Sequence, residues 1–168
     1  MALEVKVEEV NILEIIEKSD LSSENKKKIL ESGMILLPAA FSTSHKRGNF
    51  SSETPNFLKY VRAQHPEIKV ALFENTGEEK IQGLHAVDII IPPILSLIQD
   101  VSFQVILAIV STYLYEKLKG DPQKETRRIK TEIYYKESAD GKIKHINYEG
   151  PVNGLKDIEK IVNSKKKK

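Results

Sequence analysis

The sequence predicts one α/β (or α+β) domain built on a small mixed sheet. Three observations favour it: a strand–helix–strand order over residues 34–73, a long apolar segment over residues 94–119, and an alternating segment over residues 129–136 that a returning strand follows. We expect a βαβ unit, a long central helix, and a C-terminal β-hairpin with a short helix. The 168 residues suit a single domain, which we place at residues 1–164.

The first 33 residues are predicted to be a helical N-terminal extension. Apolar residues recur on one helical face at Val10, Leu13, Ile16 and Leu21. A second short helix is expected to start at Ser22 or Ser23 and to stop at Gly33. The α/β core is then expected to span residues 34–164, followed by a disordered lysine tail at residues 165–168.

The core is expected to begin with a buried strand at residues 34–37, followed by a polar loop over residues 40–53. Pro55 is a favourable first helical residue, and the helix that it starts should end before Pro66. Residues 69–73 form the next apolar run. A helix between two such strands predicts that the strands are parallel.

Residues 86–91 are expected to form another strand or the lead-in to a helix, ended by Pro92 and Pro93. No glycine or proline interrupts residues 94–119, which predicts one long helix. In the hairpin, the turn is expected at residues 139–141 and the returning strand at residues 142–148. A final short helix, capped by Asn153, should follow.

Charge is distributed unevenly along the chain. Residues 1–115 carry 11 Lys and Arg against 15 Asp and Glu, whereas residues 116–168 carry 15 against 9. A basic C-terminal third could face an acidic partner, nucleic acid or an anionic membrane, or it could be an ordinary solvated surface. The absence of cysteine excludes disulfides, thiolate zinc sites and cysteine nucleophiles. The N-terminus lacks the pattern of a secretory signal, so we expect a cytoplasmic protein.

Residues 89–115 are the segment that could anchor the protein in a membrane. The run without charge after Asp100 ends at Glu116, which is shorter than the ~20 residues that a span needs. Including Asp100 and the Pro92-Pro93 break makes insertion unfavourable. Membrane association therefore remains possible but not favoured, and we expect this helix to be buried or to contact a protein partner or a second copy of the chain.

The loop over residues 42–49 is the candidate ligand site. Ser44, His45, Lys46 and Arg47 follow a strand, where α/β folds often bind ligands, and such side chains could hold an anion. A plain surface loop is the simpler alternative, because no phosphate-binding glycine motif is present. The spacing of the histidines matches no metal site, and we expect no catalytic residue and no cofactor.

Five residues are candidates for partner binding: Gln104 and Ser111 on the polar side of the long helix, and Lys130, Lys142 and Lys144 on the hairpin. The hairpin lysines, with Lys136, could align on one side. Nucleic-acid binding by the protein is not expected, because the acidic residues Glu132, Glu137, Asp140 and Glu149 interrupt this set.

Residues 54–163 also show a recognisable order of elements. The segments concerned are Phe57–Arg62, His65–Val70, Tyr113–Leu118, Thr131–Tyr134, Asp140–Lys142 and Leu155–Asp157. In this order the chain resembles the effector-associated constant component proteins of bacterial conflict and defence systems. The resemblance implies a non-enzymatic accessory protein that binds an effector. It implies no catalytic residue.

Overall fold

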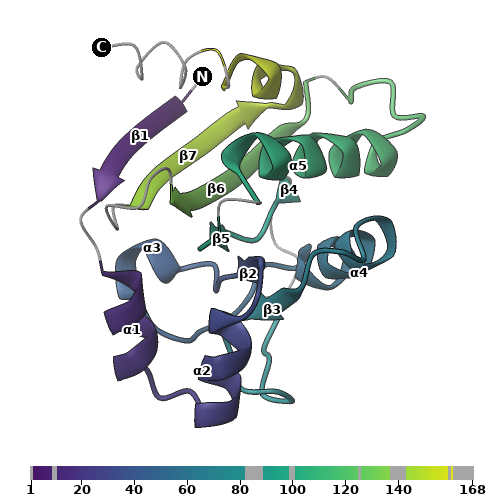
Figure 1. The fold of residues 1–168 in the computed structure, drawn as a ribbon. Coiled ribbons are helices and arrows are strands. Elements are labelled where there is room, and N and C mark those ends of the chain that lie inside the picture. The colour runs from purple at the N-terminus through teal and green to yellow at the C-terminus, as the bar shows by residue number, and fades with distance from the viewer. Residues whose placement is uncertain are drawn as a thin grey trace.

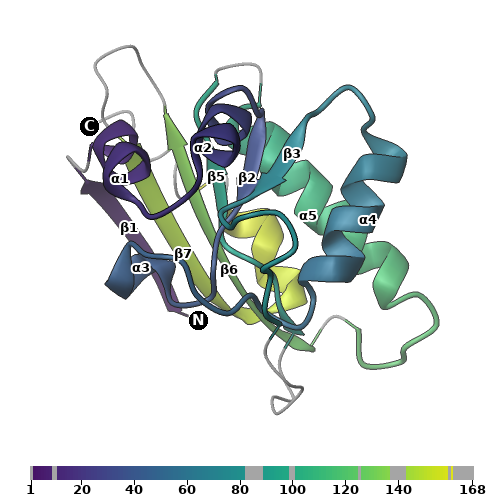
Figure 2. The same ribbon diagram turned by 90° about the horizontal axis from the view of Figure 1, so that it is seen from below.

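One mixed β-sheet runs through the protein, with helices on both faces (Figures 1 and 2). The structure is a computed structural model and describes residues 2–8, 11–81, 89–98, 101–124, 126–136, 143–158 and 160. Its strands are β1 (Ala2–Glu8), β2 (Met34–Leu36), β3 (Val70–Leu72), β4 (Ile89–Ile90), β5 (Ile94–Ser96), β6 (Arg128–Lys136) and β7 (Ile143–Pro151). They follow the order β1-β7-β6-β5-β2-β3, and β4 also pairs with β6.

The helices form two layers around this sheet, which confirms the α/β fold. They are α1 (Ile12–Lys18), α2 (Ser23–Leu30), α3 (Phe41–Ser44), α4 (Thr54–Gln64), α5 (Phe103–Lys117) and the 3-10 helix η1 (Val152–Gly154), which helical residues 155–158 follow. One buried cluster joins α4 and α5 to the sheet through residues such as Phe57, Ile106 and Ile133. A second cluster joins α1, α2 and α3 to the opposite face through Ile16 and Phe41.

The predicted βαβ unit is confirmed. β2 and β3 are parallel, with Met34 opposite Val70, and α4 connects them. The helix begins at Thr54 and has proline in its first turn, where a missing backbone N–H costs nothing. The chain before it is less irregular than expected, because α3 forms inside the predicted loop over residues 40–53.

The N-terminal segment corrects one prediction. Residues 2–8 are not helical but form β1, which pairs antiparallel with β7 at the edge of the sheet. Leu3, Val5 and Val7 alternate with charged residues, and this period of two is typical of a strand. The two predicted helices that follow are present as α1 and α2, and Ser22 caps the second through its side chain. The segment is therefore part of the α/β core rather than an extension.

The predicted helix over residues 94–119 is also shorter than expected. Residues 94–96 form β5, a central strand between β2 and β6, and α5 begins only at Phe103 after the Ser102 cap. A buried strand and a buried helix both present apolar residues continuously, so periodicity does not separate them. Residues 89–115 therefore contain two short strands before the helix. Among the described residues, no helix is long and apolar enough to cross a membrane.

The C-terminal hairpin is confirmed. β6 and β7 pair antiparallel over nine residues each, from Arg128 opposite Pro151 to Lys136 opposite Ile143. A short helical segment follows β7 as predicted, but it begins with η1 at Val152, so Asn153 lies inside this segment and is not its cap. The predicted turn at residues 139–141 and the predicted tail at residues 165–168 lie outside the described residues.

Candidate functional site

A cleft of about 1220 Å³ opens beside α1 and α3, and the four residues of the predicted ligand site line it. His45 ends α3 in the left-handed conformation, with φ 53°. Its ring lies 5.5 Å from that of Phe41, which packs in the core. The turn at His45 lies between Ser44 and Lys46, and Ser44, Lys46 and Arg47 line the same cleft.

Arg47 is held by three carboxylates in this cleft. Its Nε and Nη2 donate to the two carboxylate oxygens of Asp20 at 2.7 and 2.8 Å. Its Nη1 donates to Glu78 Oε2 at 2.7 Å and also to the buried Glu74. Hydrogen bonds from the guanidinium lower the pKa of Asp20 and of Glu78 below the ordinary values, and these carboxylates raise the pKa of Arg47. Arg47 therefore joins three segments of the chain.

This network changes what the cleft can bind. The planar donors of Arg47 are already used by carboxylates, so an incoming anion would have to compete with them. Of the predicted site, Ser44, His45 and Lys46 remain available to a ligand. Asp20, Glu74 and Glu78 were missed because they lie 27 to 31 residues from Arg47, and no local motif marks them. Among the described residues, no group of His, Asp and Glu is placed to hold a metal ion.

The outer face of α5 is a second candidate surface. Gln104 and Ser111, the predicted partner-binding residues, are both exposed there. The exposed side chains of residues 104–115 are Gln104, Val105, Ala108, Ser111, Thr112 and Tyr115. None of them is charged, although the side of a surface helix that faces water normally carries charges. Tyr115 is 59% exposed and Val105 36% exposed. We call these six residues the α5 outer face.

The structure does not bring the hairpin lysines together. Lys130 lies opposite Glu149, and Lys144 lies opposite Tyr135, so the two lysines belong to opposite faces of the sheet. Lys142 lies outside the described residues. On the face of Lys130, the hairpin buries Glu132 beside His145, with 3.6 Å between Glu132 Oε1 and His145 Nε2. The predicted alignment of these lysines on one side is therefore wrong.

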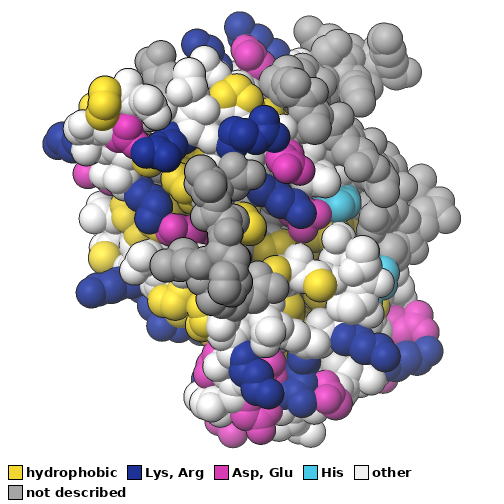
Figure 3. Space-filling model, turned by 180° about the vertical axis from the view of Figure 1, so that it is seen from behind, with side chains coloured by type: hydrophobic (Ala, Val, Ile, Leu, Met, Phe, Trp, Pro, Cys, Tyr) yellow, Lys and Arg dark blue, Asp and Glu magenta, His cyan; other side chains and the backbone are white. Residues whose placement is uncertain are grey.

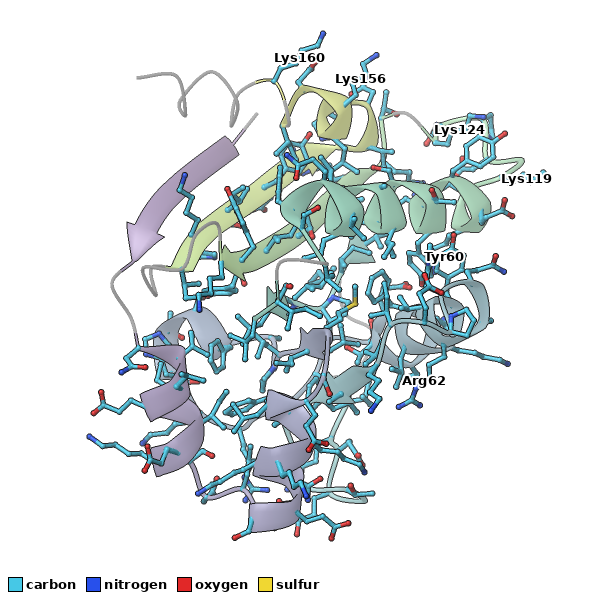
Figure 4. The ribbon with its side chains drawn as sticks, viewed as in Figure 1. Tyr60, Arg62, Lys119, Lys124, Lys156 and Lys160 are labelled. Atoms are coloured by element: carbon cyan, nitrogen blue, oxygen red, sulfur yellow. The ribbon has the colours of Figure 1, made fainter. Side chains whose placement is uncertain are left out.

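A different set of lysines lies along one edge of the molecule. Lys119 and Lys124 follow α5, and Lys156 and Lys160 lie on the C-terminal helical segment (Figure 4). All four side chains are exposed, and no described carboxylate forms an ion pair with any of them. We call these four residues the lysine edge. The sequence signal for it was only the excess of positive charge in residues 116–168.

The back of the molecule carries charged side chains of both signs (Figure 3). Viewed from behind, the described surface carries Lys and Arg side chains interspersed with Asp and Glu (Figure 3). Such a mixture is usual for a solvated protein surface.

Comparison of the chain with models of protein families, with curated proteins and with solved structures gave no match. The cleft, the α5 outer face and the lysine edge are therefore the basis for inferring function.

Proposed function

We propose that the protein is a non-enzymatic interaction module that binds a protein partner through the α5 outer face. The observation that carries this proposal is the absence of charge from the exposed side of α5 over residues 104–115. Through the resemblance of residues 54–163, the proposed partner is an effector protein of a bacterial conflict or defence system.

The chemistry of this face favours a protein as its occupant. Ala108 and Ser111 are small, so a second chain can approach the helix backbone closely. Gln104 and Thr112 offer hydrogen bonds, and an exposed tyrosine is typical of protein interfaces. The opposite side of α5 is anchored in the core by Phe103, Ile106 and Val110, which are each at most 1% exposed. The outer face is therefore presented on a helix whose opposite side is anchored in the core.

Affinity purification of the tagged full-length chain from its native cells tests the proposal. The wild-type protein should co-purify with one partner chain in stoichiometric amount. If the partner is a second copy of the protein, light scattering should give the mass of a dimer. Ala108→Glu combined with Ser111→Glu should remove that chain, because it places two carboxylates in the centre of the interface. The matched variant Ala63→Glu with Gln64→Glu adds the same charge to exposed positions of α4 and should retain it.

Two results would overturn the proposal. One is a wild-type protein that is monomeric and has no stoichiometric partner. The other is a partner that binds both double variants equally.

A second candidate function, a small-ligand sensor, is favoured by the cleft itself. Ser44, His45 and Lys46 line a cavity large enough for a small molecule. Inorganic phosphate is a suitable probe for the anion-binding form of this hypothesis. Phosphate should raise the melting temperature of the wild-type protein and not that of His45→Ala with Lys46→Ala. Equal shifts in both proteins would contradict this function.

A further inference from the structure

We infer that the lysine edge, together with Tyr115, is a binding surface for single-stranded nucleic acid. This inference goes beyond the proposed function: it shares Tyr115 with the α5 outer face, but its four lysines lie outside residues 104–115, and its test leaves Ala108 and Ser111 unchanged. Nucleic-acid binding was not expected from the sequence, because acidic residues interrupt the hairpin lysines; the lysine edge is a different surface.

Unpaired positive charge is the first argument. The two arginines at this end of the molecule have carboxylate partners: Arg127 pairs with Asp121 at 2.9 Å, and Arg128 lies 3.8 Å from Glu149. The four lysines of the lysine edge have no carboxylate partner among the described residues. Lysine is depleted from protein–protein interfaces, whereas it is a common partner of backbone phosphates. The composition of this edge therefore favours a polyanion over an acidic protein surface.

The placement of the lysines is the second argument. Lys119 and Lys124 lie in the segment that follows α5, and Lys156 and Lys160 lie one turn apart on the C-terminal helical segment (Figure 4). A hydrogen bond from Val152 N to Arg127 O, 2.9 Å long, holds these two regions together. Positive charges arranged along an edge can contact successive phosphates of a flexible, linear polyanion. In contrast, Arg62 on α4 points away from α5 and is not part of this surface.

Tyr115 supplies the third argument. Tyr115 is 59% exposed, and the ammonium of Lys124 lies over its ring, 5.7 Å from the ring centroid. An exposed ring beside a cation offers a base a stacking surface and offers the adjacent phosphate a counter-charge. Bases in a duplex are already stacked on one another, so this pairing favours a single strand.

Binding of a fluorescein-labelled 20-nucleotide oligothymidylate to the full-length protein, followed by fluorescence anisotropy, tests the inference. At 50 mM salt we expect binding that weakens steeply as salt is raised, because phosphate contacts release counterions. Lys119→Glu with Lys124→Glu should weaken binding by about tenfold or more and reduce the salt dependence. Lys27→Glu with Lys28→Glu, which changes the same charge at exposed positions of α2, should leave binding within about twofold of wild type.

Two further variants separate stacking from simple charge attraction. Tyr115→Ala should weaken binding of the oligonucleotide about tenfold, whereas Tyr115→Phe should retain it, because both phenylalanine and tyrosine offer an aromatic face. Circular dichroism should show that every variant is folded.

Three results would overturn the inference. The first is that the wild-type protein does not bind the oligonucleotide at 50 mM salt. The second is that the two lysine double variants lose affinity equally, and the third is that the wild-type protein binds a 20-residue polyglutamate as tightly as the oligonucleotide. All variants keep Lys165–Lys168, so binding through those residues alone would leave Lys119→Glu with Lys124→Glu unaffected and would also contradict it.

Discussion

The hydroxyl of Tyr113 donates a 2.5 Å hydrogen bond to the carboxylate of Glu53 and so joins α5 to the residue that precedes α4. Lys117 Nζ lies 2.8 Å from the other oxygen of the same carboxylate. Glu53 is 8% exposed, and a buried carboxylate is tolerated only when it is paired in this way. The network fixes the position of the helix that carries the α5 outer face.

Tyr113→Phe should lower the free energy of unfolding by about 1–3 kcal/mol, because it leaves a buried carboxylate oxygen without its donor. The edge-on contacts of the ring with Phe57 and Tyr60 would be kept, so the loss reports the hydroxyl. Urea unfolding measures the change. Tyr115→Phe is the control, since Tyr115 is exposed and should tolerate the loss of its hydroxyl. A Tyr113→Phe protein as stable as the wild type would show that the hydrogen bond contributes nothing.

The same tyrosine predicts a pH dependence on the alkaline side. Burial and the hydrogen bond to Glu53 raise the pKa of Tyr113 above its ordinary value of about 10. Its contribution to stability is therefore intact below pH 10 and is lost as the pH rises above it, because the unfolded chain releases the proton first. Unfolding free energies measured between pH 8 and 11 should fall less steeply in Tyr113→Phe than in wild type. Parallel curves would contradict the assignment.

An element of this fold could be predicted from the sequence where the spacing of its apolar residues is typical of only one kind of secondary structure. The hairpin alternates cleanly from Ile129 to Tyr135, and the helix before Pro66 has distinct start and stop residues. Ile94–Ser96 lies in the middle of the sheet and is apolar on both faces, so its sequence resembles the start of a helix. Residues 2–8 alternate between apolar and charged side chains, as a strand does. The apolar residues that follow them have helical spacing, and the helix predicted from that spacing was wrongly extended back over residues 2–8.

The residues of the candidate sites that are adjacent in sequence could be predicted, whereas those brought together by the tertiary fold could not. Ser44, His45 and Lys46 are adjacent in sequence, and one loop was enough to bring them to the cleft. The partners of Arg47 come from α1's C-terminal end and from the loop after β3, and only the tertiary fold brings them together. The lysines of the hairpin seemed aligned because their positions in the register were unknown. A shift of one residue in register moves a side chain to the opposite face.

Arg47→Met should destabilise the protein by about 3 kcal/mol, since it leaves the buried carboxylate of Glu74 without its partner. The double variant Arg47→Met with Glu74→Gln should recover part of this loss. Arg62→Met removes an exposed arginine without a described ion pair and should change stability by no more than about 0.5 kcal/mol. Thermal or urea unfolding measures all three. Equal effects of the two single variants would show that the network is not structural.

Acid titration tests the same network independently. Arg47 lowers the pKa of Asp20 and of Glu78, so their contribution is present above their ordinary values near pH 4 and is lost as the pH falls through the lowered values. Wild-type stability should therefore fall between pH 5 and pH 2. The Arg47→Met curve should be flatter over that range, because both carboxyls then titrate near their ordinary pKa in the folded and unfolded states. An unchanged slope would assign the acid sensitivity to other groups.

Gly150 lies under the ring of Tyr148, two residues earlier on the same face of β7. A Cβ atom at Gly150 would lie 2.9 Å from the Tyr148 hydroxyl oxygen and 3.2 Å from Cζ. The ring cannot move aside freely, because Tyr148 is fully buried and its hydroxyl donates a 2.5 Å hydrogen bond to the carbonyl of Pro151. Gly150→Ala should therefore lower the free energy of unfolding by about 1–3 kcal/mol.

Gly48→Ala is the matched control for this substitution. A Cβ atom at Gly48 would meet only Pro38 Cβ, at an ordinary contact distance of 3.6 Å. Replacing this glycine restricts the unfolded chain without a clash, so stability should stay the same or rise by up to about 1 kcal/mol. Denaturant unfolding of both variants compares the two positions directly. If Gly150→Ala were as stable as Gly48→Ala, the Tyr148 ring would have room to move, and its hydrogen bond to Pro151 would not hold it in place.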